Sequence, residues 1–267
     1  MYPSRLFVVS LLALAGHATC ARAMDKFEIQ VYQGEHNEPG QVSCELHSNY
    51  TFSGQRAPGY SGETPADRAL RFTLEPAVGV TDWLELGAYL QGMHSPYDGA
   101  QFGGWKLRAK FMVPERAKLP VTLGINVEVG RVPRRVEEAG WANEFRPIVG
   151  VALGRFGATF NPIFGFALTG PEAGKPDFEP ALKGKVHVDH GFALGLEYYA
   201  ALGRFDQGFS PWRHQEHLLF AVFDLEPEAD ARKAAASEWE LNIGLGRALS
   251  EATPQSWVLK TIVGRSF

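Results

Sequence analysis

Apolar and polar residues alternate at every second position along most of the chain. In 42–52, Cys44, Leu46 and Phe52 share one parity, while Glu45 and His47 fall on the other. This period of two is that of a β-strand whose faces meet different surroundings. The pattern predicts twelve strands, at 42–52, 69–80, 83–91, 104–112, 119–130, 144–153, 156–168, 177–188, 192–201, 217–225, 238–248 and 256–267.

The links between these strands alternate in length. Thr81-Asp82 and Gly154-Arg155 are tight, whereas 53–68 and 131–143 are long and polar. The link 226–238 is Ala-rich, and we expect a short helix there. An even strand number, with short turns at one end and long loops at the other, is typical of bacterial outer-membrane barrels.

The two parities differ in chemistry. One is bulky and apolar, with aromatic residues at strand ends, and the other carries full charges in nearly every strand. This predicts an all-β, transmembrane, antiparallel up-and-down barrel with its apolar face towards lipid. A soluble sandwich or lipocalin-like barrel, with the apolar face inward, is the alternative. The predicted lumen-lining or pore-lining residues are Glu45, His47, Arg71, Glu75, Glu85, Lys106, Arg108, Lys110, Glu128, Arg146, Asn161, Glu179, Lys183, Lys185, Glu197 and Lys260.

Residues 1–23 have the pattern of a secretory signal peptide. Arg5 precedes the apolar run 6–16, and Ala21-Arg22-Ala23 forms a cleavage motif. Cleavage before Cys20, as in a lipoprotein, is the alternative. Removal of 1–23 takes away two positive charges and no negative one, so the formal charge falls from −4 to −6.

Export, charge and cysteine content narrow the possible partners. The negative charge argues against nucleic acid, and Cys44 is left without a disulfide partner. No mature stretch has the 18 or so apolar residues of a membrane-spanning helix. We therefore expect a monomer in outer-membrane lipid.

The residues that precede the first predicted strand form a separate unit. In 24–41, Phe27, Ile29 and Val31 alternate with polar residues, yet a thirteenth strand would place the two ends of the barrel on opposite sides. We expect this segment to plug the lumen or to cap its periplasmic mouth. A first strand in a shifted register is the alternative. The predicted organisation is a leader (1–23), an N-terminal segment (24–41) and a barrel (42–267).

Four strands share a proline motif, at Pro76, Pro147, Pro162 and Pro180. Proline lacks a backbone donor, and a closed barrel has no free edge where that loss is harmless. We therefore predict a bulge beside each proline. The residue before each proline faces the lumen. Either the motif serves only to curve the wall, or these polar residues form a constriction in the lumen.

Two stretches resemble known outer-membrane proteins. The C-terminal strand ends at Phe267, similar to the signal by which such proteins reach their insertion machinery, although Arg265 occupies a position that is usually apolar. The hairpin "LEPAVGVTDWLELGAYL" (74–90), through Val80, Thr81-Asp82 and Leu84–Gly87, resembles outer-membrane transporters of the phenol-degradation MetA-pathway type. That resemblance implies a barrel of this size that transports a small molecule.

No catalytic, metal or cofactor motif stands out. The length is similar to that of outer-membrane phospholipases, but their His-x-Ser-Asn-Gly stretch is absent. Glu45 and His47 share one strand face, and a carboxylate–histidine pair of this kind can act as a general base. The pairs His187/His190 and His214/His217 have residue types that can bind a metal. We interpret the first as part of a lumen network and the others as solvated strand ends. The predicted function is a small-solute channel, with a non-conducting structural barrel next and an outer-membrane enzyme third.

Overall fold

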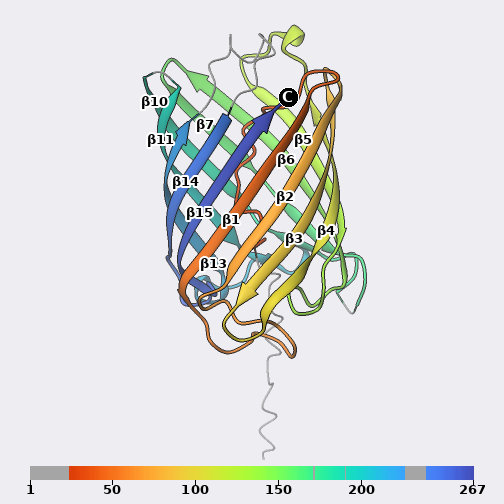
Figure 1. Cartoon of the computed structure of the whole chain (residues 1–267), viewed down its shortest axis with the longest axis vertical. Coiled ribbons are helices and arrows are strands. Elements are labelled where there is room, and N and C mark those ends of the chain that lie inside the picture. Colours follow the sequence, from red (N-terminus) through yellow and green to blue (C-terminus); the bar gives the residue numbers. More distant parts are fainter. Residues whose placement is uncertain (1–23, 171, 190, 226–238) are drawn as a thin grey trace, which may run out of the picture.

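The computed structural model of the chain describes residues 24–170, 172–189, 191–225 and 239–267. Over these residues the protein is a closed twelve-stranded antiparallel β-barrel (Figure 1), which confirms the predicted fold. The predicted leader, 1–23, and the predicted helix, 226–238, lie outside the described residues.

The barrel wall is built from fifteen β-segments. The described helices are single 3₁₀ turns, and none is long or apolar enough to cross a membrane. The segments are β1 (Val42–Gly54), β2 (Leu70–Thr81), β3 (Leu84–Ser95), β4 (Gly99–Met112), β5 (Thr122–Arg131), β6 (Trp141–Leu153), β7 (Phe156–Asn161), β8 (Phe164–Ala167), β9 (Pro176–Phe178), β10 (Ala181–Asp189), β11 (Phe192–Ala201), β12 (Gly203–Arg204), β13 (Glu216–Leu225), β14 (Trp239–Ala248) and β15 (Gln255–Ser266), with η1 (Glu115–Ala117), η2 (Phe205–Gln207) and η3 (Trp212–His214).

Three of the twelve strands are interrupted. Each of these strands is made of two segments in line: β7 and β8 form one, β9 and β10 the next, and β11 and β12 the third. Neighbouring strands pair in sequence order, and β1 closes the barrel against β15. Backbone hydrogen bonds link Val42 and Phe267 in both directions, at 2.8 and 3.4 Å, so both ends of the wall lie at one rim. We call this the inner rim, and the opposite end with the long loops the outer rim.

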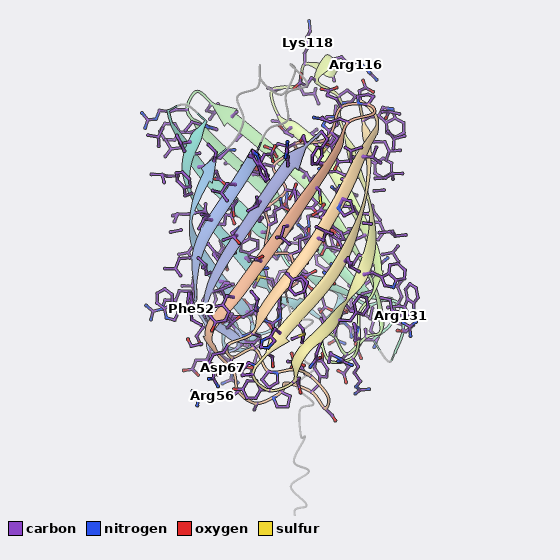
Figure 2. All side chains as sticks on the ribbon, viewed as in Figure 1. Phe52, Arg56, Asp67, Arg116, Lys118 and Arg131 are labelled. Atoms are coloured by element: carbon purple, nitrogen blue, oxygen red, sulfur yellow. The ribbon has the colours of Figure 1, made fainter. Side chains whose placement is uncertain are left out.

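The strands turn their apolar side chains outward and their charged side chains inward. In β4, Leu107 is 52% exposed, while its neighbour Arg108 is buried. The alternative in which the apolar face fills the interior is therefore wrong. Charged residues mark the two rims, with Arg116 and Lys118 at one end and Arg56 and Asp67 at the other (Figure 2). The band between them is the surface that lipid would contact.

The predicted loop 92–103 is mostly strand. β3 and β4 run on to a turn at residues 96–98, beyond the predicted strand ends. The pairing shifts between Gln91 and Gly92, so Gly103 is an extra residue in β4. A Cβ at Gly103 would lie 2.6 Å from the Phe27 ring, and Gly104 has φ +125°. The two glycines thus form a β-bulge that admits an interior aromatic ring.

The prolines do not all behave as expected. At Pro76 and Pro147 the pairing with β1 and β5 runs on in register, so the predicted bulge there is wrong. Pro162 and Pro180 instead interrupt their strands, between β7 and β8 and between β9 and β10. The residue pairs on either side of these prolines keep a single register, which places Pro147 opposite Pro162 and Pro162 opposite Pro180. One level of the wall therefore lacks three N–H donors.

Arg265 has two aromatic partners at the inner rim. Its guanidinium lies 5.1 Å from the Trp239 ring centre and 5.0 Å from that of Phe267. Cation–π contacts and the nearby rim allow a charged residue on the outward face of the last strand.

Candidate functional site in the barrel lumen

Residues 24–37, which we call the lumen segment, run lengthwise through the barrel. At the outer end, Lys26 forms an ion pair of 2.9 Å with Glu63, in the loop between β1 and β2. At the inner end, the backbone N–H of Asn37 donates to Glu85 at 2.6 Å. Between them Phe27, Ile29 and Val31 are buried. The segment passes inside the wall in Figure 1, and it belongs to none of the barrel strands.

Wall side chains take the place of a β-ladder for the backbone of this segment. A buried peptide group needs a partner, and here the partners are polar side chains from several strands. Asn161 of β7 is bidentate: it accepts from the Tyr32 N–H at 2.8 Å and donates to the Tyr32 carbonyl at 3.0 Å. Further side chains donate to its carbonyls, among them Asn49 to Phe27 O at 2.9 Å, Lys260 to Ile29 O at 3.1 Å, Arg146 to Gln30 O at 3.1 Å and Lys110 to Glu35 O at 2.6 Å.

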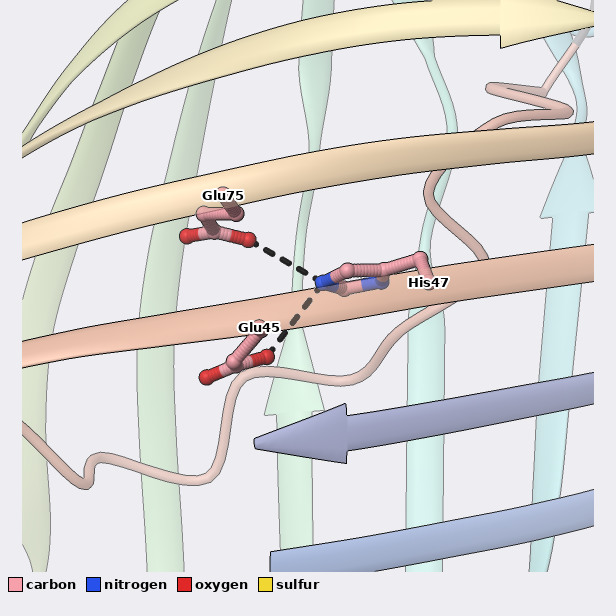
Figure 3. A group of neighbouring side chains, drawn as sticks. All are labelled: Glu45, His47 and Glu75. Carbon is pink, nitrogen blue, oxygen red and sulfur yellow. Dashed lines mark hydrogen bonds and ion pairs between the residues drawn. The ribbon is translucent and has the colours of Figure 1, made fainter. Parts of the chain in front are cut away.

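A first charge cluster lies on β1–β4 towards the inner rim. Arg108 bridges two carboxylates, with Nε 2.6 Å from Glu75 and Nη2 2.7 Å from Glu85. Lys110 lies 3.0 Å from the same Glu85. His47 Nε2 lies between Glu75, at 3.1 Å, and Glu45, at 3.3 Å (Figure 3).

A second cluster joins the wall to the lumen segment. Lys106 Nζ lies 2.5 Å from Asp25 and 3.0 Å from Glu128. Arg146 pairs with Glu144 at 2.7 Å, and its guanidinium lies 4.4 Å from the Tyr32 ring centre. The Tyr32 hydroxyl also forms hydrogen bonds in this cluster, to Glu28 at 2.6 Å and with Tyr89 at 2.5 Å.

The third cluster lies on the far wall, across β10, β11, β13 and β15. Lys183 pairs with Asp224 at 2.8 Å and with Glu197 at 3.1 Å. Lys260 also pairs with Glu197, and the Tyr199 hydroxyl donates to the Glu197 carboxylate at 2.6 Å. Buried ions are costly unless they are paired, so these contacts are what allow full charges in a narrow barrel.

The structure thus brings thirteen of the sixteen predicted lumen residues into these clusters or onto the lumen segment. Arg71 is buried with its guanidinium 6.0 Å from the Phe27 ring centre. Glu179 is buried as well, and Lys185 is half-buried beside Gly157. None of the sixteen is exposed.

Cavities lie beside the lumen segment. A space of about 90 Å³ lies between residues 30–35 and the wall at Glu45 and Glu75. A vestibule of about 970 Å³ opens towards the inner rim and shares Glu45, Arg108 and Gly264 with the first cavity. A route from the inner rim therefore reaches Glu45.

Sequence reasoning missed the partners that the lumen segment itself supplies. Asp25, Glu28 and Tyr32 each contact charged wall residues, but only the path of the segment brings them there. Tyr89 and Glu144 could have been found from parity, since each shares the inward face with residues that were predicted.

No protein-family model and no curated protein matches the chain. Among solved structures, it is similar to an outer membrane channel from Pseudomonas putida F1, with a TM-score of 0.57 and 16% identity over 90% of this chain and 100% of that one. The KdgM porin gives a TM-score of 0.49 and 8% identity, and the NanC porin 0.48 and 8%, each over 84% of this chain and 98% of that one. The first of these likenesses shows that the chain has the fold of an outer-membrane channel barrel.

Proposed function

We propose that this protein is a monomeric bacterial outer-membrane channel for a small solute, and that the lumen segment closes it in the state described here. The observation that carries the proposal is the way the segment is attached. Side chains hold it, while the barrel ladder is complete without it. Such a segment can leave the lumen without opening an edge of the sheet.

The outward surface supports placement in a membrane. Leucine, valine and aromatic side chains cover the outside of the strands, and charges gather at the rims or in the lumen. Export through the leader 1–23 and insertion through the Phe267 signal are parts of the same proposal. The MetA-type hairpin resemblance and the fold shared with the Pseudomonas putida F1 channel both favour transport over catalysis.

A non-conducting structural barrel is the second candidate. It is favoured by the close pairing of lumen charges, which resembles a polar core more than an open water-filled pore. The basic row Lys106, Arg108 and Lys110 faces carboxylates from its neighbours and from the lumen segment, so little net field is left along that wall.

Deletion of residues 25–37 separates the two functions. In planar bilayers the shortened channel should conduct more than the full chain, because the segment no longer occupies the lumen. It should still change gel mobility on boiling, because all its wall strands are intact. Removal of residues 57–59 from the outer loop is the control, and it should leave conductance unchanged. If both the full chain and the 25–37 deletion are silent yet heat-modifiable, the protein is a structural barrel.

A further inference from the structure

We propose that Glu45, His47 and Glu75 form a binding site for a divalent transition-metal cation on the lumen wall, for which Zn²⁺ is the probe. The three ligand atoms are His47 Nε2, Glu45 Oε2 and Glu75 Oε2, and all lie within 4.8 Å of one another (Figure 3). The proposal goes beyond the channel function, because every ligand belongs to β1 or β2 and none to the lumen segment.

The spacing of the ligand atoms fits a metal. His47 Nε2 is 3.1 Å from the Glu75 oxygen and 3.3 Å from the Glu45 oxygen. Zn²⁺ takes nitrogen and carboxylate ligands with bonds of about 2.0–2.2 Å, which in a tetrahedron puts neighbouring ligand atoms about 3.3–3.6 Å apart. One imidazole with two carboxylates suits a transition metal better than Mg²⁺ or Ca²⁺, which prefer oxygen ligands alone.

The strand pairing gives a second, independent reason. Glu45 and Glu75 are direct cross-strand partners on the inward face of β1 and β2. Like charges directly opposite each other destabilise a sheet. A cation between the two carboxylates removes that repulsion.

Hydrogen bonding alone leaves the group incomplete. His47 is 1% exposed, and its Nε2 carries at most one proton. A hydrogen bond joins this nitrogen to Glu75, while Glu45 Oε2 and His47 Nδ1 are buried without a hydrogen-bond partner among the described residues. Two carboxylate oxygens thus converge on one nitrogen, whose single N–H can form a linear hydrogen bond to only one of them, whereas a metal at this point binds both.

The surroundings orient the ligands and leave access. Arg108 Nε binds the other oxygen of Glu75 at 2.6 Å, which turns Glu75 Oε2 towards His47. Gly264 lies opposite Glu45 on β15 and leaves space beside it. The cavity of about 90 Å³ is lined by Glu45 and Glu75 and offers room for a water as a fourth ligand.

The test is calorimetric titration of the purified full-length protein in detergent with Zn²⁺, after treatment with a chelator. We expect one Zn²⁺ site per chain whose affinity falls on the order of tenfold or more in His47→Gln and in Glu45→Gln. His94→Gln, which changes an exposed histidine on β3, is the matched control and should bind as the wild type does. Mg²⁺ and Ca²⁺ should give no saturable heat.

A second readout separates a metal site from a structural ion pair. Without metal, Glu45→Gln should leave the temperature of the gel-mobility change unchanged or raise it, because it removes the repulsion from Glu75. Added Zn²⁺ should raise this temperature in the wild type but not in the variant. Absence of Zn²⁺ binding, binding that survives His47→Gln, or a lower metal-free transition in Glu45→Gln would each overturn the proposal. None of these outcomes depends on whether the barrel conducts.

Discussion

The side chain of Asn161 pairs with both backbone polar groups of Tyr32, a residue 129 positions earlier in the chain. It accepts from the Tyr32 N–H at 2.8 Å and donates to the Tyr32 carbonyl at 3.0 Å. This is the pattern that a neighbouring strand would offer, and here one side chain supplies it. Asn161 therefore holds the middle of the lumen segment against β7.

Replacing this residue should loosen the segment. Asn161→Ala leaves two buried peptide groups of Tyr32 without partners, which costs about 1–3 kcal/mol for each unsatisfied group. In planar bilayers we expect more frequent or larger openings than in the wild type, with the barrel still heat-modifiable. Asn242→Ala is the matched control, because that amide binds Asp224 and Glu197 on the wall. Equal opening of the channel in the two variants would mean that Asn161 does not hold the lumen segment more strongly than other lumen amides do.

Arg108 should matter more to stability than any charge at the rim. Arg108→Gln leaves the buried carboxylates of Glu75 and Glu85 without their shared cation, and breaking a buried pair costs about 3–5 kcal/mol. We expect that loss in the free energy of unfolding, measured by denaturant titration in lipid vesicles. Arg116→Gln removes the exposed pair with Asp82 and should change stability by about 0–1 kcal/mol. Similar losses in the two variants would show that the first cluster is well hydrated.

The outward face should reject a charge at mid-strand. Leu107 lies on the outside of β4, between the aromatic positions Trp105 and Phe111. In a bilayer, Leu107→Arg should lower the free energy of unfolding by about 2–4 kcal/mol, the range for a cation near the midplane. Leu249→Arg, in the turn between β14 and β15, should stay within about 0.5 kcal/mol of the wild type. A Leu107→Arg barrel as stable as the control would argue against lipid contact at this face.

The proline level of the wall should open more easily than the β1–β15 seam. Pro147, Pro162 and Pro180 lie side by side, and none can donate to the ladder. Amides next to them, such as those of Phe164 and Ala181, should exchange hydrogen faster than those of β1 and β15 between residues 47–51 and 258–262. Mass spectrometry of the folded barrel in detergent measures this. Uniform protection around the wall would show that the prolines cost no local stability.

The period-two pattern determined much of the wall from the sequence alone. In a strand, successive side chains point to opposite faces, so a charged parity in 42–52 or 104–112 fixes which residues share the interior. That local rule places Glu45, Arg108 and Lys260 inside the barrel without any knowledge of their neighbours. It does not show where a bulge falls, and Gly103-Gly104, which has the composition of a loop, is a bulge because the Phe27 ring needs that space.

Only the tertiary structure decided which of these residues meet. Glu45 faces Glu75 because the 55–69 connection sets the register of β2 against β1. No local propensity within either strand encodes that register. The lumen segment is a stronger case, since its alternation predicts a strand while its path depends on contacts with strands up to 231 positions away, as between Ile29 and Lys260. The face to which a residue points is set within one strand. The register between strands and the path of the lumen segment depend on the whole closed barrel. The sequence therefore determines what lines the barrel, and the fold determines what each lining residue contacts.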